Sequence, residues 1–422
     1  MKIRGGRLWK YSDFLKLWAA ESISVFGITI STVALPLVAI ITLNASASEL
    51  GILKALHHTP VLLFGLFMGA WIDRVRRHPL MIAAEFSNGI LLAIIPVTAV
   101  LGALRIELLY FVNFFGGMIS AVYILASISF LPSIVNQEDL VEANSKLSAG
   151  RSVAKIVGPG LAGVLIEILT APMTLVLDVF SFLISGVCLL FIRPSESVEV
   201  DNQKHRGIWR EIGEGLRLIF FHPILRSMTV GTAIASFGSA IHSTVYLLYL
   251  TRELMISPSW LGIIMGCAGV AALVGATFAT PAARRYGPAS LLIGAPLLQS
   301  IGLGLVPFIG ELDRAVIPIL IVAQALFGVA VTVYSITQLS LRQAVTPDEL
   351  LGRVNASWRV LVGGVIPFGA MIGGVLGETI GLQLTLVVGA FVGFVSFVFH
   401  LCSPLRHVTD FDKTSKSTNF KD

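Results

Sequence analysis

The stretch "VLLFGLFMGAWIDRVRRH", residues 61–78, joins an apolar run to a cluster of charged residues. Its first twelve residues carry no charge, whereas Asp73, Arg74, Arg76 and Arg77 follow within five positions. In membrane proteins, arginines gather where a hydrophobic helix ends on the cytoplasmic side. The stretch therefore predicts a membrane-spanning helix that leaves the lipid near residue 73.

The composition extends this interpretation to the whole chain. Of 422 residues, 55% are hydrophobic and only 13% are charged. A soluble domain averages about 25% charged residues, and a single soluble core does not grow large enough to bury so many apolar side chains. The sequence therefore predicts an all-α membrane protein, because backbone polar groups in lipid must be satisfied within each segment.

A helix needs about 20 apolar residues to cross a bilayer. Twelve such runs are present, near residues 14–43, 48–72, 79–102, 106–134, 141–169, 172–192, 224–251, 257–283, 288–310, 314–341, 351–379 and 382–403. The runs do not alternate every second residue over about ten positions, as the strands of a membrane barrel would.

The basic residues indicate the orientation of these spans. Twelve spans place both termini on one side, and most lysines and arginines fall in loops on that side. The opposite side has only Arg105, Arg252 and Arg314. The positive-inside rule therefore predicts cytoplasmic termini. The net charge of +5 lies in loops rather than on one folded face, so no nucleic-acid partner is expected.

The longest polar break, residues 193–223, divides the chain nearly in half. Its second part places Ile208, Ile212, Leu216 and Ile219 at helical spacing, which is typical of an amphipathic helix on a membrane surface. We therefore expect a helical bundle at residues 1–192 and a second one at 224–403. A cytoplasmic linker at 193–223 joins them, and a cytoplasmic tail follows at 404–422.

The two halves repeat each other at an offset of 211 residues. "LGI" at 50–52 matches "LGI" at 261–263, and "AGVLIE" at 162–167 matches "GGVLGE" at 373–378. Parallel repeats of six spans are a known transporter design, with the substrate site between the halves. The offset therefore predicts two pseudo-symmetric six-helix bundles.

These features resemble the major facilitator superfamily. The opening stretch matches the loop motif of that family between spans two and three. "LWAAESISVFGITISTVALPLVAI" at 17–40 and "RSVAKIVGPGLAGVL" at 151–165 resemble the branch that contains the enterobactin exporter and macrolide efflux pumps. The resemblance implies a secondary transporter and, in span five, a helix-bending antiporter motif at Gly158, Pro159 and Gly163.

The loop motif implies a conformational latch at the cytoplasmic ends of the helices. Its carboxylate would pair with an arginine or a helix N-terminus in one state and separate in another, at a cost of a few kcal/mol. The alternative is that the arginines only fix the topology. The candidate latch residues are Gly69, Asp73, Arg74, Arg76 and Arg77.

Glu21 lies within the first predicted span, where a carboxyl group is costly and is a functional-site hypothesis by default. We expect it to couple transport to protons, with Arg151 as a partner; the same arginine is also able to pair with Asp73. His57 is a further candidate because histidine titrates near neutral pH. The alternatives are hydrogen-bonded or interfacial side chains with structural roles only.

By resemblance, spans one, four, seven and ten line the substrate cavity. The polar and aromatic candidates there are Asn113, Tyr123, His242, Tyr246, Gln324 and Tyr334. Aromatic walls with few charges suit an amphipathic organic molecule. No catalytic cluster or metal-ligand spacing is present in the sequence, so neither an enzyme nor a cofactor is expected.

The sequence thus predicts an exporter of a small drug, antibiotic or siderophore, driven by proton antiport, in the inner membrane of a bacterium. Its expected partners are the substrate, protons and the lipid bilayer, and it is expected to act as a monomer. A lysophospholipid flippase or a solute importer is the alternative within transport. A non-transporting receptor or membrane enzyme is the alternative of another class.

Overall fold

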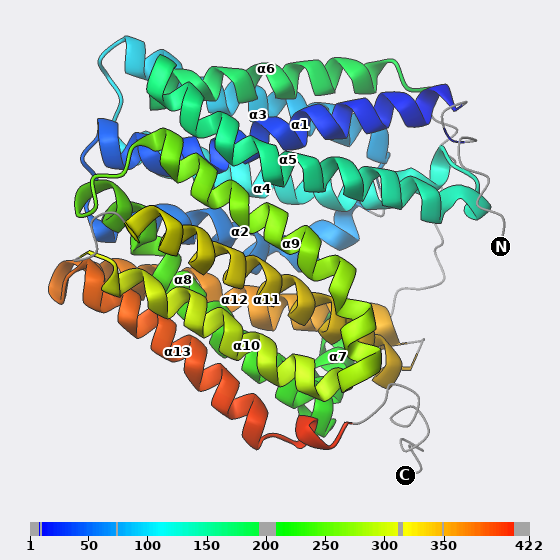
Figure 1. Ribbon diagram of the computed structural model, residues 1–422. Helices are drawn as coiled ribbons and strands as arrows, with labels where there is room; N and C mark the ends of the chain where they lie inside the picture. Colours follow the sequence, from blue (N-terminus) through cyan, green and yellow to red (C-terminus); the bar gives the residue numbers. More distant parts are fainter. Residues whose placement is uncertain are drawn as a thin grey trace. The chain divides into compact units, whose positions relative to one another are not determined.

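The computed structural model describes residues 8, 11–72, 75–193, 208–310, 315–347 and 350–408 (Figure 1). All regular structure in these residues is helical. The long helices are α1 (Ser12–Leu37), α2 (Ala47–Ile72), α3 (Arg77–Val100), α4 (Ile106–Phe130), α5 (Leu140–Leu169), α6 (Ala171–Leu190), α8 (Pro223–Arg252), α9 (Pro258–Tyr286), α10 (Pro288–Leu305), α11 (Val316–Val345), α12 (Leu351–Thr379) and α13 (Leu382–Cys402).

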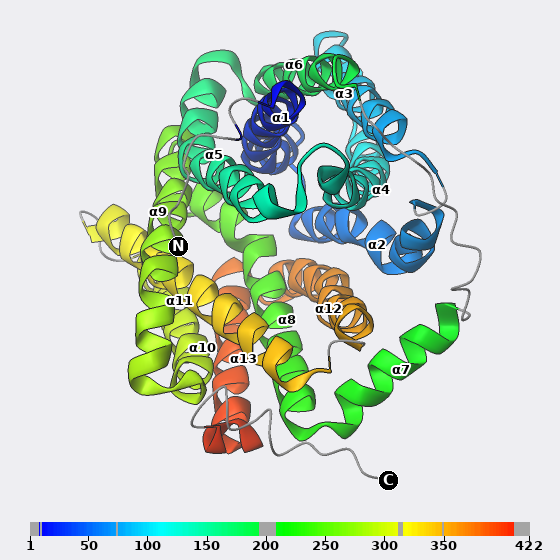
Figure 2. The same ribbon diagram turned by 90° about the vertical axis from the view of Figure 1, so that its right-hand side faces the viewer.

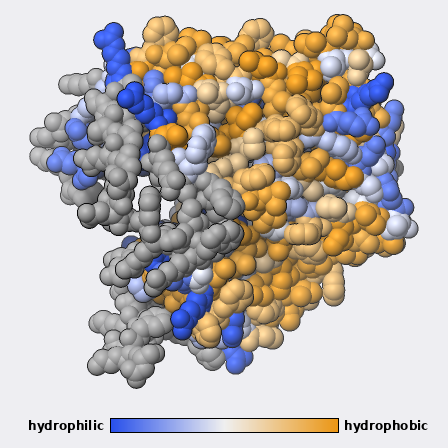
Figure 3. Space-filling view, turned by 180° about the vertical axis from the view of Figure 1, so that it is seen from behind, coloured by the Kyte–Doolittle hydropathy of each residue, from blue (hydrophilic) through white to orange (hydrophobic). Residues whose placement is uncertain are grey.

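Eleven of these helices are long and apolar enough, over the described residues, to cross a membrane. The 26-residue helix α2 is the twelfth long helix. Hydrophobic residues cover most of the face drawn in Figure 3 between the helix ends. Large apolar side chains such as Ile90, Phe180 and Phe391 point outward from the helices. Lipid is the solvent that such a surface requires, so the predicted fold class is confirmed.

The helices form two compact units. Over the described residues, unit 1 contains α1, α3 to α6, most of α2 and the start of α9, while unit 2 contains α7, α8, α10 to α13, the rest of α9 and the start of α2. The units therefore differ from the two predicted halves by two short segments, 46–58 and 257–266.

In unit 1, α1 lies between α5 and α6, and α3 packs on α4 and α6 (Figure 2). Phe14 and Leu17 of α1 are fully buried together with Met81 of α3 and Phe130 of α4. This apolar layer occupies one end of the unit and leaves the polar residues of α1 farther along the helix.

In unit 2, α8 packs against α12 and α13, and α10 packs against α11 and α13. The short helix α7 (Ile208–Phe221) packs on α12, where Glu214 is ion-paired with Arg353. Leu218 and Ile219 of α7 enter the buried core. The predicted amphipathic helix is thus present, and its apolar side covers the end of the bundle.

Glycines of α5 allow this helix to pack closely on the start of α9 and on α1. A Cβ at Gly163 of α5 would overlap the Pro258 backbone and contact Gly262, both at the start of α9. A Cβ at Gly158 would overlap the Thr29 side chain of α1. The predicted bend motif therefore lies at two helix contacts, and the bend itself stays a prediction.

This close approach makes a specific prediction for α5. Alanine is a better helix former than glycine by about 1 kcal/mol, so Gly160→Ala, whose Cβ would have nothing within 4 Å, is expected to raise the melting temperature slightly or leave it unchanged. Gly163→Ala is expected to lower it, because overpacking costs about 1–3 kcal/mol. Thermal unfolding of the two purified variants in one detergent measures the difference. Equal melting temperatures would contradict the described α5–α9 contact.

Candidate functional site

Glu21 and Arg151 form an ion pair inside unit 1. The Arg151 guanidinium donates from Nη2 to Glu21 Oε2 at 2.8 Å. Ser127 of α4 donates its hydroxyl to the other carboxylate oxygen, Oε1. Glu21 is only 3% exposed, whereas the Arg151 side chain is 46% exposed. The predicted partner of Glu21 is therefore present, and the pair connects the interior of the unit to its surface.

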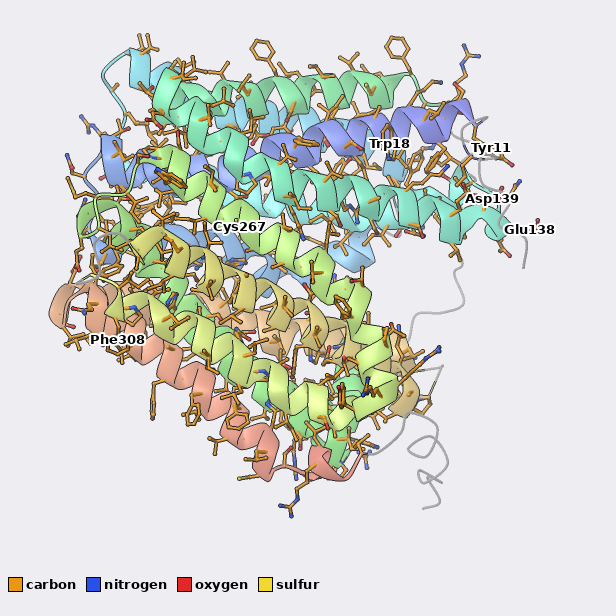
Figure 4. All side chains as sticks on the ribbon, viewed as in Figure 1. Tyr11, Trp18, Glu138, Asp139, Cys267 and Phe308 are labelled. Carbon is orange, nitrogen blue, oxygen red and sulfur yellow. The ribbon has the colours of Figure 1, made fainter. Side chains whose placement is uncertain are left out.

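The packing of α1 on α5 positions this pair. A Cβ at Gly150 would lie 3.0 Å from the Ser22 hydroxyl, so the two helices approach closely one residue before Arg151. One turn earlier, the Trp18 indole donates to the Lys146 carbonyl at 3.4 Å. Near the start of α1, the Tyr11 hydroxyl donates to Asp139 at 3.4 Å (Figure 4).

A second acid, Glu85 of α3, lies in the same interior and is 1% exposed. The Ser24 hydroxyl donates to Glu85 Oε2 at 3.3 Å. The hydroxyls of Ser185 and Tyr123 lie beside this carboxyl group, yet these two hydroxyl oxygens and Glu85 Oε1 have no hydrogen-bond partner. Tyr123 also interacts electrostatically with Glu21 and Arg151.

A third acid, Asp178 of α6, is also 1% exposed. It accepts hydrogen bonds from the hydroxyls of Ser31 and Ser181, the latter at 3.0 Å. A Cβ at Gly27 would overlap both Asp178 and Ser181, so glycine is needed for α1 to reach α6 here.

The charges in this interior do not balance. Within the described residues, Arg151 is the cation that pairs with one of the three buried acids, and it pairs with Glu21. Glu85 and Asp178 are held by hydroxyl groups instead. We refer to Glu21, Arg151, Tyr123, Glu85 and Asp178 as the acid cluster.

Four predicted cavity residues lie in unit 2. Gln324 of α11 donates to the Tyr246 hydroxyl at 2.7 Å, and His242 stacks on Tyr246 with ring centroids 5.6 Å apart. The Tyr334 hydroxyl lies 2.7 Å from the Thr232 hydroxyl and 3.0 Å from His400 Nε2. His242, Tyr246, Gln324 and Tyr334 are therefore held by hydrogen bonds or stacking within the unit, and their contact with a substrate stays a prediction.

The other predicted residues lie apart from the acid cluster, except Tyr123. Asn113 donates to the Leu109 carbonyl of its own helix at 3.3 Å. His57 is exposed on the part of α2 that belongs to unit 2, with its ring 5.2 Å from His58. It is therefore not part of the cluster in unit 1.

The predicted latch is described only in part. Asp73 and Arg74 lie outside the described residues, and Gly69 lies in the last turn of α2. Arg76 is exposed immediately before α3, and Arg77 begins that helix with its Nε buried and without a hydrogen-bond partner. The latch therefore stays a prediction.

A comparison with known protein families assigns the chain. The family described as "Transmembrane secretion effector" matches residues 9–422, which is almost the whole sequence. The chain belongs to this family of major facilitator transporters. The members named below are transporters rather than enzymes, as the sequence predicted.

The chain is similar along most of its length to three bacterial efflux proteins. The multidrug efflux pump Tap of Mycolicibacterium fortuitum is 24% identical over 86% of this chain and 88% of its own length. Macrolide efflux protein A of Streptococcus pyogenes is 21% identical over 94% of this chain and 97% of its own length. The enterobactin exporter EntS of Salmonella typhi is 22% identical over 90% and 88%.

Solved structures share the fold of this transporter. A mutant of the nucleoside transporter NupG superimposes with a TM-score of 0.74 at 11% identity, over 92% of this chain and 98% of that one. An inward-facing bacterial homologue of the iron transporter ferroportin gives 0.73 at 15% identity, over 94% and 99%. The major facilitator fold is thereby confirmed.

Glu85 and Asp178 were not among the predicted site residues, and neither were Ser24, Ser31 and Ser127, whose hydroxyl groups hold the acids. An available signal was the recurrence of polar residues along α1, where Glu21, Ser24 and Ser31 occupy one stripe of an otherwise apolar span. Serine is common in membrane helices, so this stripe alone does not identify an acid partner.

The ion pair makes a prediction for stability. Arg151→Gln leaves the buried Glu21 carboxylate without its cation and is expected to destabilise the transporter more than Glu21→Gln. The double variant is expected to recover part of the loss, with a coupling free energy of about 1–3 kcal/mol. A double-mutant cycle of unfolding free energies measures it.

The pair between Asp13 and Lys16 is the matched control, because it lies near the start of the same helix and both side chains are 31% exposed. Its coupling is expected to be about 0.5 kcal/mol or less. Equal coupling in both cycles would contradict a special role for the buried pair.

Proposed function

We propose that this transporter exports small amphipathic organic compounds in exchange for protons, by alternating access. Drugs, antibiotics and siderophores are the proposed substrate classes, in keeping with the names of the three bacterial relatives. The observation that carries the proposal is the acid cluster, in which three buried carboxyl groups share one paired cation. Ionisable groups inside a membrane bundle mark proton relays in pumps and transporters.

The two acids nearest Tyr123 have different roles in the proposal. Glu21 is stabilised as a carboxylate by Arg151 and Ser127. Glu85 has a hydroxyl donor and one unpartnered oxygen but no ion pair among the described residues. A buried charge without a cation is costly, so Glu85 is the proposed carrier of the exchanged proton. A proton on its unpartnered oxygen has the Tyr123 or Ser185 hydroxyl as an acceptor.

Loss of the Glu21–Arg151 pair is the proposed link between protonation and conformation. While Glu85 holds the proton, Glu21 stays the carboxylate that pairs with Arg151. When the proton passes from Glu85 to Glu21, Glu21 loses the charge that holds Arg151 against α1, and the half-exposed guanidinium is then free to turn to water. This weakens the contact between α1 and α5. Proton uptake therefore favours one packing of the unit and proton release the other, as population shift requires.

The proposed orientation puts both termini in the cytoplasm of a bacterial cell, because the loops on that side hold most of the lysines and arginines. The transporter is proposed to act as a monomer in the inner membrane. Gly69, Asp73, Arg74, Arg76 and Arg77 would form the latch on the cytoplasmic side. The polar and aromatic residues Asn113, Tyr123, His242, Tyr246, Gln324 and Tyr334 would contact substrate.

Transport assays test this function. In bacteria that lack their own efflux pumps, expression of the transporter is expected to lower the accumulation of at least one fluorescent drug, macrolide or catecholate siderophore. A protonophore is expected to restore accumulation, because it removes the proton gradient. Unchanged accumulation for every compound would contradict export, and export that survives the protonophore would contradict proton coupling.

Variants of the acids sharpen the test. Glu85→Gln removes the proposed proton carrier while keeping its shape, so it is expected to abolish pH-driven uptake into inverted vesicles but to retain substrate binding. Glu107→Gln is the control, because Glu107 is exposed in the first turn of α4. Pumping by Glu85→Gln at the rate of the control would remove Glu85 from the coupling scheme.

A further inference from the structure

Arg342, near the end of α11 in unit 2, is a buried cation that has no counter-ion among the described residues. It is 5% exposed. Its Nε and Nη1 atoms have no hydrogen-bond partner, and no ion pair to it occurs among the described residues. Burying a guanidinium group without an acceptor is among the costliest arrangements in a protein. Such a group needs an anion in at least one state of the molecule.

The indole of Trp358 on α12 covers one face of the guanidinium, with 4.1 Å between Arg342 Cζ and the ring centroid. A cation–π contact of this kind does not replace the lost hydrogen bonds, because it is directed at the face of the guanidinium and leaves the N–H edges open. The indole Nε1 is itself buried and without a partner. The unpartnered nitrogens Nε and Nη1 of Arg342 and Nε1 of Trp358 thus belong to two groups that are in contact.

Two more unsatisfied polar groups lie near Arg342 in the sequence. Gln338 is one turn before Arg342 on the same face of α11, and Thr346 is the extended residue that directly follows the helix. They are 2% and 5% exposed, and Gln338 Nε2 and Thr346 Oγ1 have no hydrogen-bond partner. Buried polar groups are normally satisfied, so several unsatisfied groups at the end of one helix need an explanation.

The charged neighbour of Arg342 is also a cation. Arg359 of α12 interacts electrostatically with Arg342, and the other titratable group in range is the neutral Tyr334 hydroxyl. Arg359 is exposed and Trp358 is half-buried, so they form the outer edge of the site.

We infer that Arg342, Gln338, Thr346 and Trp358 form a binding site for an oxyanion, meaning a phosphate or carboxylate group. The guanidinium fork matches the spacing of two anionic oxygens, and the amide, hydroxyl and indole groups supply further donors. The ligand reaches Arg342 when the indole of Trp358 moves aside.

The oxyanion has two possible sources, an anionic lipid headgroup at the membrane surface and a soluble anion. Melting temperatures in neutral detergent at fixed ionic strength separate them. The probes are inorganic phosphate, short-chain phosphatidylglycerol and short-chain phosphatidylcholine as the zwitterionic control. A ligand that binds the folded state raises the melting temperature with its concentration.

The wild-type transporter is expected to be stabilised by phosphatidylglycerol and not by phosphatidylcholine. Stabilisation by phosphate as well assigns a soluble oxyanion, and stabilisation by phosphatidylglycerol alone assigns a lipid headgroup. Arg342→Gln is expected to weaken the response about ten- to hundredfold in ligand concentration, because a hydrogen bond to a charged group contributes about 1.5–3 kcal/mol. Arg284→Gln, at an exposed arginine of α9, is the control and is expected to respond like the wild type.

A second variant keeps the test decisive if Arg342→Gln fails to fold. Gln338→Leu with Thr346→Val removes two unsatisfied donors and keeps the arginine. If these donors hold the anion, the response to it weakens. No response to either anion in the wild type, or an equal response in both variants and the control, would overturn the site. These measurements involve no transport, so they succeed or fail independently of the proposed export function.

Discussion

The ion pair between Arg151 and Glu21 is the interaction on which the interior of unit 1 depends. It neutralises one carboxyl group where three are buried, and the other two are left to hydroxyl donors from α1 and α6. Because lipid surrounds the helices, none of these groups is able to turn outward to water except through the exposed end of Arg151. The pair therefore joins α1 to α5, and in the proposed function its loss on protonation is what changes that packing.

The sequence repeat has a direct structural counterpart in contacts of the helix ends. Gly163 lies against Gly262 in unit 1, and Gly374 lies against Gly51 in unit 2. The offset of 211 residues relates Gly163 to Gly374 and Gly51 to Gly262. The same offset relates two polar contacts. Ser259 donates to Glu167, and the backbone N–H of Ser48 donates to Glu378. Small residues and an acid thus recur together where segments of one half pack on helices of the other.

Composition and hydropathy were sufficient to predict the fold, because lipid imposes helices of one length whatever their side chains. Glu21 was recognised because a carboxylate in an apolar span is rare, and pairing with Arg151 was one of two options. The sequence alone did not decide whether Arg151 pairs with Glu21 or with Asp73, because the answer depends on how α5 is rotated about its own axis. Glu85 and Arg342 were missed for related reasons. The partners of Glu85 come from three other helices, and Arg342 follows a span, where the positive-inside rule already explains an arginine.

The central claim is that Arg151 keeps Glu21 as a carboxylate while Glu85 binds the proton. Infrared difference spectroscopy of the reconstituted transporter tests it directly, because a protonated carboxyl group has a carbonyl stretch separate from the amide bands. At neutral pH the wild type and Glu107→Gln are predicted to show a buried carboxylic-acid band that loses intensity in Glu85→Gln and keeps its intensity in Glu21→Gln. A spectrum in which Glu85→Gln keeps the full intensity of this band, or in which Glu21→Gln loses it, would contradict the account.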